Sequence, residues 1–281
     1  MSQTRRLDEI GIWSEVKLAI LRDYASAYSR ILAAQSSPKL HHVYVDGFAG
    51  AGVHISKMSG EFIPGSPLNA LNIQPPFREY FLVDLNRGRV AGLKELIGER
   101  TDVHLFAGDC NEVLLKDVFP RVRYNDYRRG LCVLDPYGLH LNWEVIRTAG
   151  EMQSIDMFLN FPLADMNHNV LWHNTDRVNP KEAGRMTRFW GDESWREAAY
   201  SQSQTLFGDF VPEKEPNAVV AEAFRQRLRK VAGFKRVPEP LPMRNSKGSI
   251  VYYLFFASQK GTAENIVLDI FNKYRNAGLA R

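Results

Sequence analysis

The stretch that decides the fold is VYVDGFAGAGVHI, residues 43–55, in which an apolar run ends in a carboxylate and glycines follow. The β-branched and aromatic residues before Asp46 predict a buried strand. Gly47, Gly50 and Gly52 come directly after it, and glycines let a backbone approach a ligand closely. Parallel α/β sheets usually bind ligands at the carboxyl ends of their strands. We therefore expect a ligand-binding crevice after this strand.

The spacing of the glycines favours one class of ligand. A dinucleotide site has G-x-G-x-x-G ahead of a helix whose N-terminus binds the pyrophosphate. Here the order is G-x-x-G-x-G, and the sequence predicts no helix immediately after it. The stretch instead resembles the D-x-F-x-G-x-G first motif of S-adenosylmethionine-dependent methyltransferases, whose cofactor has no phosphate. The resemblance implies that six residues hold this cofactor: Asp46, Gly47, Phe48, Ala49, Gly50 and Gly52.

Two further acids follow strand-like segments. Asp84 ends the run EYFLVD, and Asp109 lies in AGDCNEV. In the methyltransferases, an acid at the first of these places accepts hydrogen bonds from the ribose hydroxyls, and one at the second binds the adenine amine. The resemblance adds Asp84 with Leu85, and Asp109 with Cys110, to the cofactor site. Taken alone, an acid at a strand end is more often a helix cap; the order of the three acids favours the cofactor.

The rest of the chain alternates predicted strands and helices. Five strand-like runs separated by amphipathic or short helical segments imply right-handed crossovers and a doubly wound, mostly parallel sheet. Two late runs, 235–245 and 249–259, predict an antiparallel hairpin. This order is typical of the Rossmann-like class I methyltransferase fold. The predicted strands lie at 41–47, 79–86, 102–114 (a strand and a turn), 129–138 and 154–163, and the predicted helices at 13–34, 66–73, 87–100, 142–151, 217–234 and 262–278.

The helical period is lost in one segment, residues 165–215. It contains Trp172, Trp190 and Trp195, three of the five tryptophans. We interpret residues 1–281 as a single methyltransferase-like α/β domain and this segment as a helical insertion that recognises the target. Ser14 is expected to cap the first helix.

The sequence CVLDPYG, residues 132–138, ends the fourth strand, where the transferred methyl group would lie. Amino-methyltransferases that act on nucleobases carry Asp/Asn-Pro-Pro-aromatic there: the acid accepts a hydrogen bond from the base amine and the aromatic ring stacks on the base. Here the second proline is missing and the aromatic residue comes one position early. We assign Asp135, Pro136 and Tyr137 to catalysis, with strand termination and packing as the alternative.

The end of the fifth strand, in LNFPL, offers a weaker signal. Asn160, Phe161 and Pro162 could line the target pocket, or could belong to the core and a turn. A cytosine-C5 enzyme would need a cysteine just after the proline, whereas Cys132 precedes it inside the strand. The histidines show no ligand spacing for a metal.

The composition and charge of the whole chain limit the classes of protein to which it can belong. No apolar run reaches the roughly 18–20 residues that span a bilayer. Two cysteines in 281 residues fit a reducing cytoplasm. The net charge of +4 permits a nucleic-acid partner without requiring one.

Segments along nearly the whole chain resemble a bacterial family, the three-Cys-motif partner proteins (TcmP). The most specific are RGLCVLDPYGLHLNWEVI, FLNFPL and RFWGDESWREA. The arrangement is more distantly similar to ribosomal RNA adenine methyltransferases. The family name implies a partner protein with a three-cysteine, radical-enzyme-like motif.

We therefore predict an S-adenosylmethionine-dependent methyltransferase that acts on an exocyclic base amine of DNA or RNA. Two alternatives stay open. One is a methyltransferase for a small molecule or a protein, and the other is a non-catalytic partner that keeps the fold.

Overall fold

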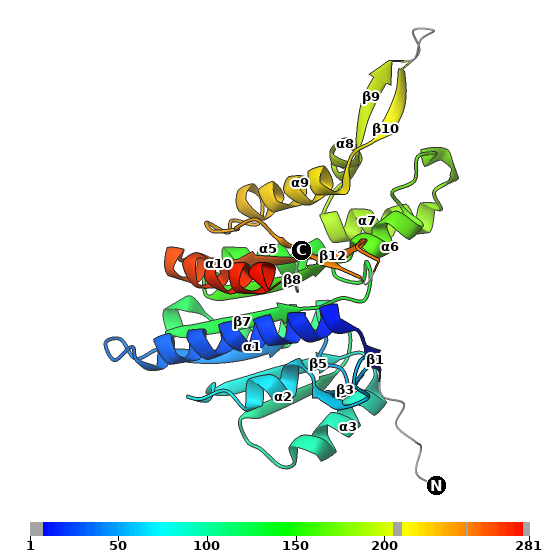
Figure 1. The fold of residues 1–281 in the computed structure, drawn as a ribbon. Coiled ribbons are helices and arrows are strands. Elements are labelled where there is room, and N and C mark those ends of the chain that lie inside the picture. Colours follow the sequence, from blue (N-terminus) through cyan, green and yellow to red (C-terminus); the bar gives the residue numbers. More distant parts are fainter. Residues whose placement is uncertain (1–7, 205–209, 246, 278–281) are drawn as a thin grey trace.

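The computed structural model describes residues 8–204, 210–245 and 247–277 (Figure 1). Its central sheet has seven strands: β2 (His41–Asp46), β5 (Glu79–Asp84), β6 (Val103–Ala107), β7 (Arg128–Leu134), β8 (Ile155–Phe161), β11 (Leu241–Arg244) and β12 (Ile250–Ala257). Their order is β11-β12-β8-β7-β2-β5-β6. The pairs among β6, β5, β2, β7 and β8 are parallel, and β12 is antiparallel to both β8 and β11. The predicted doubly wound sheet with its late antiparallel hairpin is confirmed.

Helices cover both faces of the sheet, so the side chains that alternate between the two faces of each strand are buried on both sides. In β2, Val43 and Val45 pack into one core, while Tyr44 packs into the other. The core around Tyr44 includes side chains from α1 (Ile12–Ala33), α2 (Ser66–Leu71), α3 (Arg87–Ile97) and α10 (Gly261–Asn276). The core around Val43 includes α4 (Cys110–Val113), α5 (Trp143–Glu151), α7 (Pro180–Trp190) and α9 (Asn217–Lys230). These are the two helical layers of a doubly wound fold.

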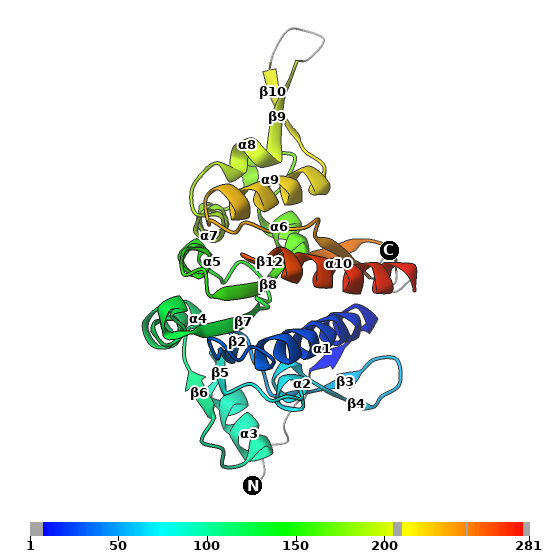
Figure 2. The same cartoon turned by 90° about the vertical axis from the view of Figure 1, so that its left-hand side faces the viewer.

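The chain after β8 forms the largest addition to this sheet. It consists of α6 (Leu163–Asn169), a 3₁₀ turn (Thr175–Arg177), α7, α8 (Trp195–Ala199) and an antiparallel ribbon, β9 (Tyr200–Gln204) with β10 (Phe210–Lys214). Figure 2 shows the ribbon extending away from the sheet. Trp190 and Trp195 are buried in the core, whereas Trp172 is exposed. Within the segment predicted to be a helical insertion, residues up to 199 form helices and turns. The ribbon of β9 and β10 is not helical.

Two local predictions were wrong. The first helix begins at Ile12 with Gly11 at its N-cap, so Ser14 lies inside the helix. Between the first motif and α2, where the sequence predicted no strand, lies a hairpin of β3 (Val53–Ser56) and β4 (Phe62–Pro64), and β1 (Glu9–Ile10) pairs with β3. Short helical turns also lie at Leu114–Val118, Phe119–Arg121 and Tyr124–Asp126. Across the described ranges, no helix has the length and apolarity needed to cross a membrane.

Candidate active site

Asp46 ends β2 and is fully buried at the carboxyl edge of the sheet. Its carboxylate accepts hydrogen bonds from the Phe48 amide at 3.0 Å and the Tyr44 hydroxyl at 3.3 Å, and from Ser66. Burial raises the pKa of Asp46 to about 6, against the effect of these bonds, and Asp135 contributes a smaller rise. Asp46 therefore holds the turn through hydrogen bonds inside the protein, and its carboxylate is not exposed to a ligand.

The burial of Asp46 predicts how the free energy of unfolding depends on pH. Asp46 has an ordinary pKa of 3.8 in the unfolded chain and about 6 in the folded one. The folded state therefore holds the proton more tightly, and stability falls as pH rises from about 4 to 6 and then stays constant. At about 1.4 kcal/mol per unit of pKa, Asp46→Asn should gain about 2 kcal/mol relative to the wild type between pH 4.5 and pH 8. Urea unfolding at both pH values measures this difference, and a pH-independent effect of the substitution would contradict it.

Two glycines of the first motif adopt backbone conformations that L side chains rarely adopt. Gly50 has φ +65° and Gly52 has φ +82°. A Cβ on Gly52 would lie 2.6 Å from Leu93 of α3. The Ala49 amide donates to the Val83 carbonyl of β5 at 2.8 Å. The turn therefore needs glycine for its geometry, and it is fastened to the neighbouring strand.

Asp84 ends β5 beside this turn. Its Oδ2 accepts from the Gly50 amide at 2.9 Å and its Oδ1 accepts from the Asn86 amide at 2.8 Å. A carboxylate has about four lone-pair positions, so both oxygens keep capacity for a ligand. Leu85 follows with 75% of its surface exposed. The structure places the second acid and an exposed apolar side chain next to the glycine turn.

Asp109 is exposed and caps α4. Its Oδ1 accepts from the backbone amide and the side-chain amide of Asn111, each at 2.8 Å. Asn111 also donates to the His140 carbonyl and accepts from the Asn142 amide. Cys110 is buried, and burial raises the pKa of its thiol to about 12. The helix-cap alternative thus holds for Asp109, and Asn111, which the sequence did not single out, ties this turn to the loop after β7.

Asp135 follows β7 and forms an ion pair with Lys17 of α1. The Lys17 residue is only 8% exposed, whereas the side chain of Asp135 is 33% exposed. The Lys17 ammonium also lies 5.3 Å from the ring centroid of Tyr252. Because the two partners are 118 residues apart, no local pattern reveals the pair. The acid of the fourth strand is therefore held by a buried cation, with part of the carboxylate open to solvent.

The loop after Asp135 is fixed from the segment beyond β8. The Leu139 amide donates to Asp165 Oδ2 at 3.0 Å, and Arg185 forms an ion pair with the same carboxylate. A Cβ on Gly138 would lie 2.8 Å from that oxygen. Within this anchored loop Tyr137 is 99% exposed. The aromatic ring therefore does not pack into the core, which removes the packing alternative for Tyr137.

The three residues at the end of β8 divide between two environments. Asn160 donates weakly to the Pro136 carbonyl at 3.4 Å, and its Oδ1 is buried without a partner among the described residues. Phe161 is fully buried and packs in the core against Phe224 and Phe255. Pro162 is buried at the start of α6. Only Asn160 joins the loop that carries Asp135, whereas Phe161 belongs to the core, the second of the two alternatives that the sequence left open.

His54 of β3 is a second side chain that sequence reasoning missed. Its Nδ1 is buried and has no hydrogen-bond partner among the residues that the structure describes. Burial lowers its pKa, and the charges of Lys17 and Asp135 both act on it. Two unpaired buried polar atoms, on His54 and Asn160, therefore accompany the Lys17–Asp135 pair. Buried polar groups usually have partners, so this edge of the sheet suits a polar ligand.

Other chemistries gain no support from the described ranges. Cys132 is fully buried inside β7, and burial raises the pKa of its thiol far above the ordinary value. Such a thiol is a poor nucleophile. Among the described residues, no three His, Cys, Asp or Glu side chains gather as a metal site would require.

No family model and no curated protein matches the chain. A Legionella pneumophila protein of the family DUF519 is similar at a TM-score of 0.51 and 13% identity over 93% of each chain. A Listeria monocytogenes protein described as a putative S-adenosylmethionine-dependent methyltransferase has a TM-score of 0.43 and 13% identity over 89% of this chain and 98% of its own. A Leishmania major S-adenosylmethionine-dependent methyltransferase has a TM-score of 0.38 and 11% identity over 87% and 82%.

The TcmP resemblance remains a prediction, because no comparison identifies a family. The order of the seven strands, with β12 antiparallel to both of its neighbours, is the one predicted from the sequence for the class I methyltransferase fold. The chain has a class I S-adenosylmethionine-dependent methyltransferase fold.

Proposed function

We propose that the protein transfers a methyl group from S-adenosylmethionine to an exocyclic amine of a nucleobase in DNA or RNA. The observation that carries this proposal is the loop after β7. It sets a partly open carboxylate, Asp135, beside a fully exposed aromatic ring, Tyr137, at the same sheet edge as the glycine turn. A flipped base needs an acceptor for its amine and a surface on which to stack.

The cofactor fits the residues at the ends of β2 and β5. The open space beside Gly50, where a Cβ would meet nothing within 4 Å, gives a backbone that a nucleoside can approach, and Asp84 would accept hydrogen bonds from the two ribose hydroxyls. The exposed Leu85 would cover one face of the adenine. Bound there, the cofactor would supply an electrophilic methyl group on a positively charged sulfur.

The chain's own groups would orient the nucleophile. One oxygen of Asp135 is held by Lys17, and the other can accept one N–H of the base amine. The Pro136 carbonyl, bonded only weakly to Asn160, can accept the second N–H. The amine lone pair would then point at the methyl carbon. As the new C–N bond forms and the C–S bond breaks, the amine would lose one proton through Asp135 to solvent. Positioning of this kind accounts for a large part of many enzymatic rate enhancements.

The test is transfer of radiolabelled methyl from S-adenosylmethionine to fractionated cellular RNA and DNA, with digestion to nucleosides to identify the modified base. Label on an exocyclic amine supports the proposal. If the label appears only in small molecules or in protein, the substrate belongs to that class and is not nucleic acid. Cofactor binding without any transfer would favour a non-catalytic partner, such as the predicted companion of a three-Cys-motif protein.

Tyr137 offers a prediction specific to a base substrate. Its ring is 99% exposed, so Tyr137→Ala should leave the melting temperature unchanged. Loss of one base–aromatic stack costs about 1–3 kcal/mol, so the KM for nucleic acid should rise roughly 10-fold. Tyr137→Phe keeps the stacking face and serves as the matched control. Equal KM values for the alanine variant and the wild type would contradict stacking by this ring.

A further inference from the structure

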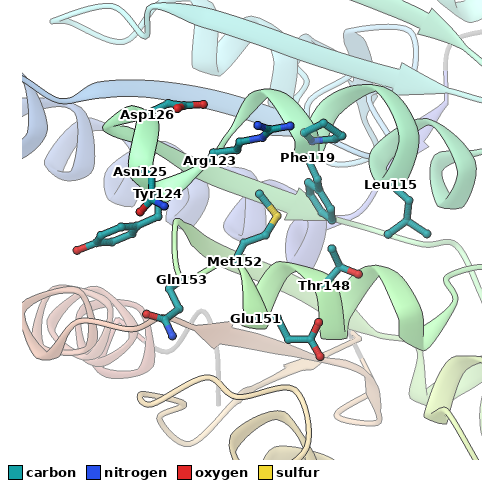
Figure 3. A pocket seen from close by; sticks show the side chains of 11 residues that line it. Leu115, Phe119, Arg123, Tyr124, Asn125, Asp126, Thr148, Glu151, Met152 and Gln153 are labelled. Carbon is teal, nitrogen blue, oxygen red and sulfur yellow. The ribbon is translucent and has the colours of Figure 1, made fainter.

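The amino edge of the sheet, opposite the candidate active site, contains two cavities. One, of about 590 Å³, lies between the turns before β7 and the end of α5 (Figure 3). The other, of about 310 Å³, is lined by α1, α10 and the amino ends of β7 and β8. Gln153 lines both and has φ +58°. A non-glycine residue rarely adopts such a backbone conformation, and those that do often lie near functional sites.

The smaller cavity has the apolar walls of a ligand pocket. Tyr24, Tyr28 and Ile31 line it from α1, and Ala263 and Ile266 line it from α10. Figure 1 shows these two helices lying side by side, and they are packed together. A volume near 300 Å³ with mostly apolar walls and a few polar groups is the lower range for small-molecule sites. The cavity can therefore hold a compound of one or two rings.

The charged residues that line the smaller cavity determine which ligand charge it favours. Its charged residues are Arg129, Asp156 and Lys260, which leave one net positive charge. Asp156 is occupied, because its carboxylate accepts from the hydroxyls of Tyr24 and Ser258. Burial raises the pKa of Asp156 to about 6, and Lys260 opposes that rise. The Asp156 carboxylate thus already has hydrogen-bond donors within the protein.

Neither cation is paired with an acid among the described residues, although Arg129 is held by other groups. The Arg129 guanidinium lies over the Tyr124 ring at 3.7 Å and donates to the carbonyls of Tyr124 and Arg128. Lys260 is exposed at the N-cap of α10, where no side chain caps the helix. Among the described residues, neither cation has a carboxylate within ion-pair distance. An anion would therefore meet two positive charges that have no counter-ion among the described residues.

One further group lacks a partner. Gln259 donates through Nε2 to the carbonyls of Gly150 and Gly233, but its Oε1 is buried without a hydrogen-bond partner in the described ranges. Gln259 also lines the smaller cavity. An unpaired buried acceptor costs about 1–3 kcal/mol. A ligand with an N–H or O–H group would satisfy it.

We propose that the pocket between α1 and α10 binds a small aromatic carboxylate that carries an N–H or O–H donor. The ring lies against the tyrosines of α1, the carboxylate faces Lys260 and Arg129, and the donor reaches Gln259. This site is separate from the proposed methyl transfer and does not depend on it.

Isothermal titration with indole-3-carboxylate tests the proposal, with its neutral methyl ester as the comparison ligand. The acid should bind at least 5-fold more tightly than the ester. Lys260→Gln should weaken acid binding at least 5-fold and leave ester binding unchanged. Ile266→Trp, which fills the cavity, should abolish binding of both. Arg275→Gln removes the same charge near the other end of α10 and should change nothing.

Melting temperatures of all variants establish that they are folded. Absence of binding to the folded wild-type protein would overturn the proposal. So would equal affinity for acid and ester, or an equal loss of affinity in the Lys260 and Arg275 variants, because either result would show that the two cations do not select the ligand.

Discussion

Asp135→Ala is expected to lower the rate of methyl transfer on the order of 100- to 1,000-fold, the range for removing a group that orients or accepts the reacting proton. The structure gives the reason: Asp135 is the partly exposed acid at the carboxyl end of β7, held by Lys17. The affinity for S-adenosylhomocysteine should change less than about 3-fold, because no proposed cofactor contact is made by Asp135. Initial rates with labelled cofactor and calorimetric titration measure the two quantities.

The same substitution leaves Lys17 buried without its counter-ion, which costs about 3–5 kcal/mol. Lost activity could then follow from lost stability alone. The double variant Lys17→Met with Asp135→Ala separates the two effects, since it removes both charges and should restore much of the melting temperature. If Asp135 orients the nucleophile, the double variant stays inactive. Recovery of activity together with stability would show that Asp135 serves only the ion pair.

The sequence could predict those parts of the site that lie in one stretch of chain. Asp84 with Leu85 and the glycine turn lie at adjacent strand ends because each follows a recognisable buried strand, and parallel strands bring their carboxyl ends to one edge. Asp109 was also placed at this edge, although its present role is to cap α4. The continuous apolar runs of these strands, which are buried on both faces, carry this information locally.

The parts that could not be predicted depend on contacts between distant segments. Lys17 and Asp135 meet because α1 lies across the sheet, and His54 comes from a hairpin inside a segment rich in glycine and proline. Phe161 follows Asn160 by one residue, and strand alternation sends it to the opposite side, into the core. The ribbon of β9 and β10 has polar residues at most positions of β9, so neither a helical nor a strand period was visible.

Asp84→Ala is expected to weaken S-adenosylhomocysteine binding about 100-fold, because hydrogen bonds to a charged acceptor contribute about 1.5–3 kcal/mol each and two ribose hydroxyls would lose theirs. A second route to the same loss exists, since Asp84 also holds the Gly50 amide and removing it could loosen the turn. The 2′,3′-dideoxy analogue of the ligand distinguishes the two routes.

Wild-type protein should bind the dideoxy analogue about 100-fold more weakly than the parent, whereas the Asp84→Ala variant should bind the two almost equally, because the acceptor that discriminates between them is gone. Asp84→Asn keeps one acceptor oxygen, so its preference for the parent ligand over the dideoxy analogue should lie between those of the wild type and of Asp84→Ala. If Asp84→Ala weakens both ligands by the same factor, Asp84 acts only through the Gly50 turn and the ribose lies elsewhere. The exposed Asp109 provides a matched acid at the same edge: Asp109→Ala should leave the discrimination between the two ligands intact, since Asp109 caps α4 and is assigned no contact with the ribose.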